Sequence, residues 1–199
     1  MHKLVKISFF SGIFLCITAI LVVLSTYIFI KPSLPKINLV DESELQMPLK
    51  IFTKDKELIG EFGEIKRRAT DYEEIPIDIK NAFLAAEDDN FFNHQGISYK
   101  GLIRSFIRCL RPTGCEGGGG TITMQVVRGY LLTRDQTIIR KIKEIYLALE
   151  LEGNISKEEI FELYVNRIFL GNRSYGIEAA SNTYFDKGLE DLTLSESAT

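Results

Sequence analysis

The clearest pattern along the chain is an apolar run from Ile7 to Ile30 that carries no formal charge. Its 24 residues suffice to cross a hydrocarbon core of ~30 Å at ~1.5 Å per residue. A secretory signal would have a shorter apolar core and a cleavage site of small residues. Here the apolar run resumes after Ser25 and Thr26. We therefore predict an uncleaved transmembrane anchor over residues 7–30.

The flanking charges orient this anchor. Lys3 and Lys6 precede it, and positive charge favours the cytoplasmic side. We predict a cytoplasmic tail at 1–6, a polar stalk at 31–47, and a domain at 48–199 on the outer, periplasmic face of the cytoplasmic (inner) membrane. The 169 residues after the anchor suffice for one domain with a hydrophobic core.

Beyond the stalk, the pattern predicts a mainly α fold with a small β-hairpin in front of it. The alternation at 49–53 and 57–62 indicates the hairpin. Helical spacing follows from Pro76 and again over 99–111. Capping boxes predict three more helices. Thr133 and Gln136 open a helix at 134–152, and Ser156 and Glu159 open one that ends near Gly171. Thr193 and Glu196 open the last. Because the sequence stops three residues after Glu196, we expect the domain to continue.

The segment 99–111 is amphipathic, with Leu102, Ile103, Phe106, Ile107 and Leu110 on one face and Lys100, Arg104, Arg108 and Arg111 on another. A basic amphipathic helix is typical of a membrane surface. The alternative is an ordinary helix that turns its apolar face to the core. The predicted anchor favours the membrane.

Charge is distributed unevenly along the chain, although the net charge is only −3. Residues 98–143 hold nine Lys and Arg against two Asp and Glu, while residues 31–97 and 144–199 are acidic. A cationic block within an acidic domain favours an anionic partner.

The cysteines and histidines predict no metal centre of their own. Cys109 and Cys115 lie six residues apart outside the predicted anchor, where a disulfide is plausible. Their spacing is unlike that of a zinc site, and only two histidines exist. We interpret Cys16, within the predicted anchor, as a small apolar residue without a chemical role.

Residues 84–97 form the main candidate site, because carboxylates end an apolar helix there. Glu87 continues the face of Phe83 and Leu84, so we predict that it points inward. A carboxylate against apolar surface has a raised pKa, which suits a general base. We interpret His94 as a hydrogen-bonded structural residue.

Three further blocks follow in the sequence. The first, 117–128, begins with a glycine run that opens a helix and offers backbone N–H groups to an anion. This block lacks the lysine and serine of a nucleotide P-loop, which excludes ATP as its ligand. The second, 140–144, places Arg140, Lys141 and Glu144 on one helical face. The third, 157–166, has apolar residues on one helical face, and we interpret it as a structural helix that packs against the core.

In this order the blocks resemble the peptidoglycan glycosyltransferase domain of class A penicillin-binding proteins, most closely the 1A type. The matching residues are Glu87-Asp88-x-x-Phe91-x-x-His94-x-Gly96, Gly118-Gly119-x-Thr121-Ile122-Thr123-x-Gln125, Arg140-Lys141-x-x-Glu144, Leu163-Tyr164-x-Asn166, and Tyr184-Phe185-x-Lys187 with Leu194-x-Glu196-x-Ala198. The resemblance covers about residues 48–199.

The resemblance implies a lysozyme-like domain that polymerises lipid II into glycan strands and releases undecaprenyl pyrophosphate. Glu87 would be the general base and Glu144 a second catalytic residue that holds a divalent metal, Mg or Mn. The substrate-binding residues would be Asp88, Thr121, Gln125, Arg128, Arg140 and Lys141. No organic cofactor and no nucleic acid are expected; cell-wall synthesis proteins are possible partners.

The sequence departs from the family pattern in the glycine block, where Gly120 replaces serine, Arg128 lysine and Gly129 asparagine. Two alternatives stay open, and these departures, with the early stop, motivate the first of them. One is a truncated, non-catalytic anchored module that binds lipid II or the cell wall. The other is a lysozyme-like hydrolase, because a single carboxylate near apolar surface also suits glycoside cleavage.

Overall fold

The computed structural model describes residues 10, 12, 14–15, 17–18, 21, 24–35, 49–55, 58–62, 70–109, 120–132 and 137–199. These residues belong to two units, Met1–Lys36 and Ile37–Thr199.

In the first unit the described residues up to Ile30 are helical, and the 3₁₀ turn η1 (Lys31–Ser33) follows. Large apolar side chains such as Phe14 and Phe29 are exposed. Among the residues that the structure describes, no helix is both long enough and apolar enough to cross a membrane. The tail 1–6, parts of the anchor 7–30 and most of the stalk 31–47 lie outside the described residues, so these assignments stay predictions.

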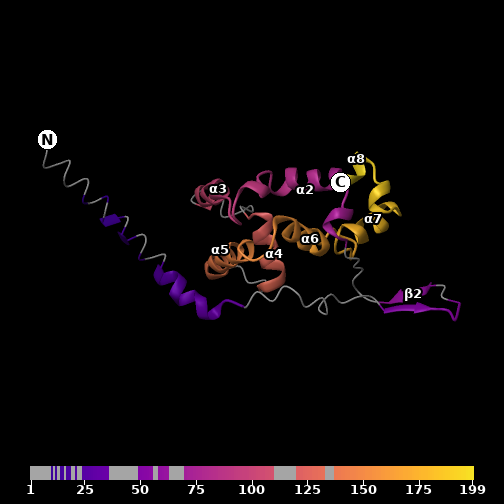
Figure 1. The fold of residues 1–199 in the computed structure, drawn as a ribbon, viewed down its shortest axis with the longest axis horizontal. Coiled ribbons are helices and arrows are strands. Elements are labelled where there is room, and N and C mark those ends of the chain that lie inside the picture. Colours follow the sequence, from indigo (N-terminus) through magenta and orange to yellow (C-terminus); the bar gives the residue numbers. More distant parts are fainter. Residues whose placement is uncertain are drawn as a thin grey trace. The chain divides into compact units, whose positions relative to one another are not determined.

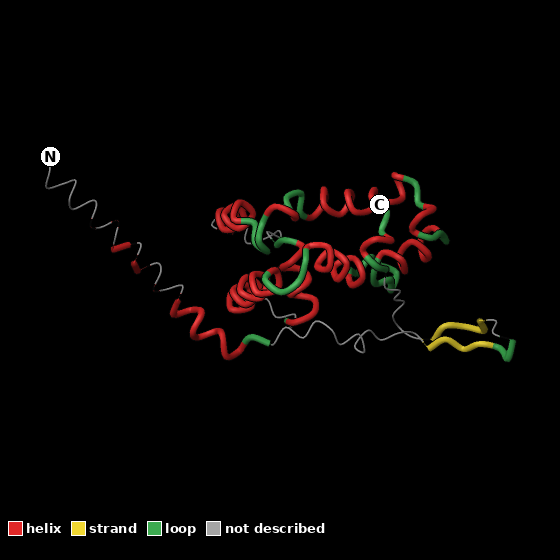
Figure 2. Tube along the Cα trace, in the orientation of Figure 1, coloured by secondary structure: helices red, strands yellow, loops and turns green. Residues whose placement is uncertain are grey.

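Two short antiparallel strands lie in the segment where the sequence predicts a hairpin (Figure 2). β1 (Leu49–Phe52) pairs with β2 (Leu58–Phe62), with Leu49 opposite Phe62 and Ile51 opposite Gly60. The register is irregular between Ile51 and Phe52.

The other elements of the second unit, among the residues that the structure describes, are helices and 3₁₀ turns, which confirms the mainly α class (Figure 1). Its elements are η3 (Tyr72–Glu74), α2 (Ile77–Glu87), η4 (Phe91–Asn93), α3 (Tyr99–Cys109), α4 (Ile122–Leu131), α5 (Ile138–Glu152), α6 (Lys157–Arg167), α7 (Ile177–Phe185), η5 (Leu189–Asp191) and α8 (Leu194–Ser197).

Helix α4 is the centre of this helical part, because it packs against both α5 and α6. Ile122 and Val127 of α4 are completely buried, as are Leu147 of α5 and Phe161 of α6. Each such side chain stabilises the fold by about 1.5–3 kcal/mol relative to an exposed one. Residues on α4 therefore have fixed positions.

The other elements are attached to this centre. Helix α6 contacts η3 and α7, and α2 contacts α8. The amide of Asn166 donates to the Thr70 carbonyl and accepts from the Thr70 N–H, both at 2.9 Å. The 157–166 block is therefore structural, as the sequence indicated.

Two of the three predicted capping boxes are present, at Ser156 with Glu159 and at Thr193 with Glu196. The predicted start of the 134–152 helix is wrong, because α5 begins at Ile138. Thr137 caps it by accepting a hydrogen bond from the Arg140 N–H. Residues 133–136 lie outside the described residues.

Helix α6 ends at Arg167, earlier than the predicted end near Gly171. Gly171 lies in the turn that follows, with φ +87°, and a Cβ there would approach the Tyr184 hydroxyl to 2.6 Å. Helix α7, which the sequence analysis did not predict, begins after Gly176 at φ +85°. Its buried face contains the small residues Ala179, Ala180 and Ser181, which give a weak periodic signal.

Helix α3 turns large apolar side chains to solvent. Tyr99 is 72% exposed, Ile103 61% and Ile107 51%. Ile103 and Ile107 of the predicted apolar face therefore do not belong to the core, while Leu102 of the same face is half-buried. Leu110, Arg111 and Cys115 lie outside the described residues, so the Cys109–Cys115 disulfide stays a prediction.

We predict that Ser156→Ala lowers the free energy of unfolding by about 1 kcal/mol, because the N-cap of α6 is lost. Urea unfolding followed by circular dichroism measures this change. Ser156→Asn is the matched control, because asparagine caps helices as well as serine does. Equal stability of the alanine and asparagine variants would contradict the prediction.

Candidate active site

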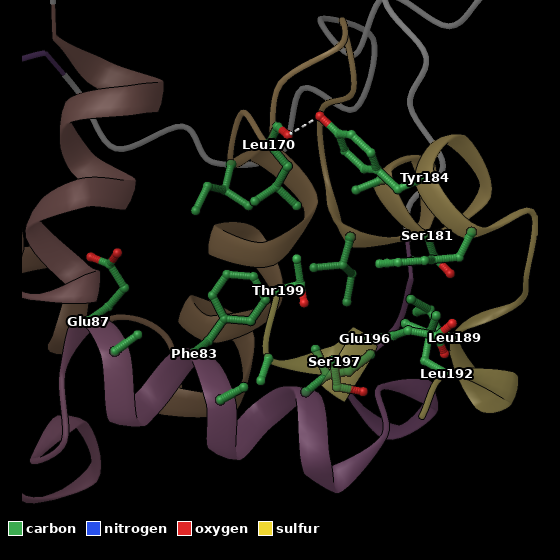
Figure 3. A pocket seen from close by; sticks show the side chains of 18 residues that line it. Phe83, Glu87, Leu170, Ser181, Tyr184, Leu189, Leu192, Glu196, Ser197 and Thr199 are labelled. Carbon is green, nitrogen blue, oxygen red and sulfur yellow. Dashed lines mark hydrogen bonds between the residues drawn. The ribbon is translucent and has the colours of Figure 1, made fainter. Parts of the chain in front are cut away.

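Glu87 is the last residue of α2 and lies at the edge of a largely apolar pocket of about 390 Å³ (Figure 3). Phe83, one helical turn earlier, lines the same pocket and packs edge-on against Tyr164 with ring centres 5.8 Å apart. The two residues therefore share a face, as the sequence predicted.

The predicted burial of Glu87 is wrong, because its side chain is exposed. Helix α2 stops at this residue, so no further turn covers the carboxylate. The desolvation that the prediction required is absent from the unliganded protein. An exposed carboxylate is nevertheless open to an approaching hydroxyl group.

The Glu87 carboxylate is oriented by α4. Gln125 Nε2 donates a hydrogen bond to Glu87 Oε2 at 2.7 Å. Gln125 follows the buried residue Met124 on the first turns of α4, so its backbone position is set by the core. The structure therefore brings together two residues that the sequence analysis assigned to the site.

The buried acid of this segment is Asp88 rather than Glu87. Asp88 is 8% exposed, and its Oδ2 accepts hydrogen bonds from His94 Nε2 at 2.8 Å and the Ile122 N–H at 3.2 Å. The Ile122 N–H is an otherwise unpaired donor at the start of α4. These contacts favour a structural role for Asp88 over its predicted substrate contact, and they place His94 in the structural role that we expected.

Thr121 also makes only internal contacts. It is 2% exposed, donates from its hydroxyl to the Gly96 carbonyl at 2.6 Å, and accepts from the Met124 N–H as the N-cap of α4. Gly96 has φ +77°, and a Cβ there would lie 2.8 Å from the Ala148 carbonyl oxygen. The segment after α2 is therefore packed onto both α4 and α5.

The pKa of Tyr164 responds to an acid and a cation of the site. Burial raises the pKa of Tyr164, the negative charge of Glu87 raises this pKa further, and Arg128 lowers it. Glu87 and Arg128 are thus both close enough to act on one hydroxyl group. That hydroxyl is buried without a hydrogen-bond partner among the described residues.

A second group of site residues lies on α5. Glu144 is 1% exposed, and its carboxylate forms ion pairs with Lys141 Nζ at 2.9 Å and Arg140 Nη1 at 3.5 Å. Lys141 also approaches the glycine block, because a Cβ on Gly120 would lie 3.7 Å from Lys141 Nζ. The structure thus brings the 140–144 block next to Gly120 of the glycine block. No hydrogen bond or ion pair within the described residues connects Glu144 with Glu87.

These residues do not fit a metal centre that the protein forms alone. Glu144 already neutralises two cations, and the described residues contain no group of three His, Cys, Asp or Glu side chains that could hold a metal ion. A hard divalent cation requires several oxygen ligands. We therefore derive no chemical step through a metal at Glu144.

Comparison with known proteins identifies one protein family to which this chain is similar. The transglycosylase family model matches residues 55–199. Penicillin-binding protein 1A of Pseudomonas aeruginosa is 46% identical over 187 residues, which are 92% of this chain and 23% of that protein. The protein of the same name from Haemophilus influenzae is 47% identical over 157 residues, 79% of this chain and 18% of that protein.

A crystal structure of Penicillin-binding protein 1A from Haemophilus influenzae aligns with 77% of this chain and 13% of that chain, at 31% identity and a TM-score of 0.37. The present chain spans about a fifth of the length of the curated relatives that it matches.

We predict that Asp88→Ala lowers the free energy of unfolding by about 3 kcal/mol, because His94 and the start of α4 lose a buried hydrogen-bond acceptor. Urea unfolding measures the effect. The matched control is Glu87→Ala on the neighbouring exposed acid, which we expect to change stability by less than about 0.5 kcal/mol. Similar effects of the two substitutions would show that Asp88 does not hold this segment.

Proposed function

Because the chain belongs to the transglycosylase family, as its five sequence motifs predicted, we propose that it is the glycosyltransferase part of a peptidoglycan synthase. In this proposal it joins lipid II units into a glycan strand. Glu87 removes the proton from the 4-hydroxyl of the acceptor sugar. That oxygen attacks the anomeric carbon of the donor with inversion, and undecaprenyl pyrophosphate leaves.

The orientation of Glu87 by Gln125 is the observation that carries this proposal. A general base must present a carboxylate oxygen within hydrogen-bond reach of the hydroxyl that it deprotonates. Glu87 meets this requirement because it is exposed, while Gln125 fixes one of its two oxygens. The other oxygen has no hydrogen-bond partner among the described residues.

Substrate would complete the environment of this base. The pocket beside Glu87 is lined mainly by apolar side chains such as Phe83, Ile177 and Leu189. A substrate that covers the pocket edge would exclude water from the carboxylate, and a less hydrated carboxylate is a stronger base.

The cations of the site would stabilise the leaving group. Negative charge develops on the departing diphosphate, and preorganised cations can lower such a barrier by a few kcal/mol. Arg128, Arg140 and Lys141 are suited to this role. Glu144 would hold the last two in place through its buried ion pairs. A divalent cation stays a prediction, and no step above depends on one.

The substrate implies a membrane, because lipid II carries a polyprenyl chain. We propose that the exposed apolar face of α3 rests on the membrane surface, in addition to the anchor predicted at 7–30. The growing glycan strand and other cell-wall synthesis proteins are the remaining proposed partners.

We predict that Glu87→Gln lowers the rate of lipid II polymerisation by roughly 10²- to 10⁴-fold, because glutamine cannot accept the proton. The assay follows glycan strands formed by the purified chain in detergent with added magnesium. Asp89→Asn is the matched control, since Asp89 is a neighbouring exposed acid. We expect this control to polymerise at the rate of the unmodified chain.

Normal polymerisation by the glutamine variant would remove Glu87 from the mechanism. A chain that binds lipid II without forming polymer would instead support the non-catalytic alternative. Release of soluble muropeptides from purified cell wall would identify a hydrolase.

A further inference from the structure

Arg167 lies against α4 beside Gly129. A Cβ on Gly129 would lie 3.4 Å from Arg167 Nε and 3.5 Å from Arg167 Cδ, so the Arg167 side chain passes within van der Waals contact of this position. The guanidinium carbon lies 4.1 Å from the ring centre of Tyr130. Tyr130 is itself fixed, because its hydroxyl donates to the Leu163 carbonyl at 3.2 Å.

Arg167 and Arg128 line the same pocket, which has a volume of about 180 Å³. The other lining residues come from α4, from α6 and from the turn after α6, and none of the lining residues is a carboxylate. Within the described part of the chain, neither arginine forms an ion pair. Arg128 is exposed and Arg167 is half-buried, so both remain available to a ligand.

One of the residues that line the pocket carries an unused hydrogen-bond donor. Tyr164 lines it and is 4% exposed, and its hydroxyl has no partner among the described residues. Because burial raises the pKa of Tyr164, the hydroxyl keeps its proton and can donate to an oxygen. A buried polar group without a partner is unfavourable, so a ligand oxygen would satisfy it.

The helix ends explain how two arginines line one pocket without a carboxylate. Arg128 lies in the last turn of α4 and Arg167 in the last turn of α6. Partial negative charge at the carboxyl end of a helix stabilises cations there. The guanidinium groups therefore keep most of their hydrogen-bonding capacity for a ligand.

We propose that Arg167, which lines the pocket beside Gly129, is a further substrate-binding residue that contacts the diphosphate of the substrate together with Arg128. Two guanidinium groups and a phenol provide the directed donors that a diphosphate accepts. The proposal rests on the function proposed above. It also gives a role to Gly129, which stands where the family pattern has asparagine.

Inorganic pyrophosphate is the probe, and calorimetric titration of the 199-residue chain in metal-free buffer measures its affinity. We expect Arg167→Gln to weaken binding roughly tenfold or more, because a charge-assisted contact is lost. Arg173→Gln is the matched control, since Arg173 is exposed and does not line the pocket. This control should bind as the unmodified chain does.

A second variant separates binding from folding. Gly129→Asn keeps the charge of Arg167 but adds a side chain in contact with it, so it should weaken pyrophosphate binding without lowering the melting temperature. Gly153→Asn is the control for a glycine substitution, because Gly153 has φ −79° and lies outside the pocket.

Polymerisation of lipid II is measured in a separate assay. A failure of the proposed glycosyltransferase function can therefore be distinguished from a failure of the proposed role of Arg167. Loss of pyrophosphate binding in both Arg167→Gln and Gly129→Asn supports the role of Arg167, even if the chain forms no polymer. Unchanged affinity in Arg167→Gln, or no pyrophosphate binding by the unmodified chain, overturns that role, even if polymerisation proceeds.

Discussion

The site depends on the attachment of the end of α2 to α4. Two adjacent acids make this attachment in different ways. Asp88 is buried and accepts from the Ile122 N–H, while Glu87 is exposed and accepts from Gln125. Because α4 packs against both α5 and α6, the position of the Glu87 carboxylate is tied to the hydrophobic core. A reactive group that is open to solvent thus has a rigid support.

The charges of the site are arranged around this support. On α5, the buried carboxylate of Glu144 neutralises part of the charge of Arg140 and Lys141 and fixes both side chains. Arg128 and Arg167 instead lack ion-pair partners among the described residues. The described cations of the site are therefore of two kinds, two held by a buried carboxylate on α5 and two without an ion-pair partner.

Local features of the structure could be predicted from the sequence, whereas tertiary ones could not. The capping boxes at Ser156 and Thr193 were found because a cap is formed by residues three positions apart. Periodicity gave the correct face of Glu87 but not its exposure, which depends on the end of α2. The pairing of Arg167 with Gly129 joins two helices, so neither residue alone indicated it.

The most direct test of this account is the rate of lipid II polymerisation by Gln125→Leu. Leucine has a similar size but cannot donate to Glu87. If α4 orients the base, kcat falls roughly tenfold while KM and the melting temperature change little, because about one hydrogen bond to a charged group is lost. An unchanged kcat in the folded variant would contradict the claim that α4 positions Glu87.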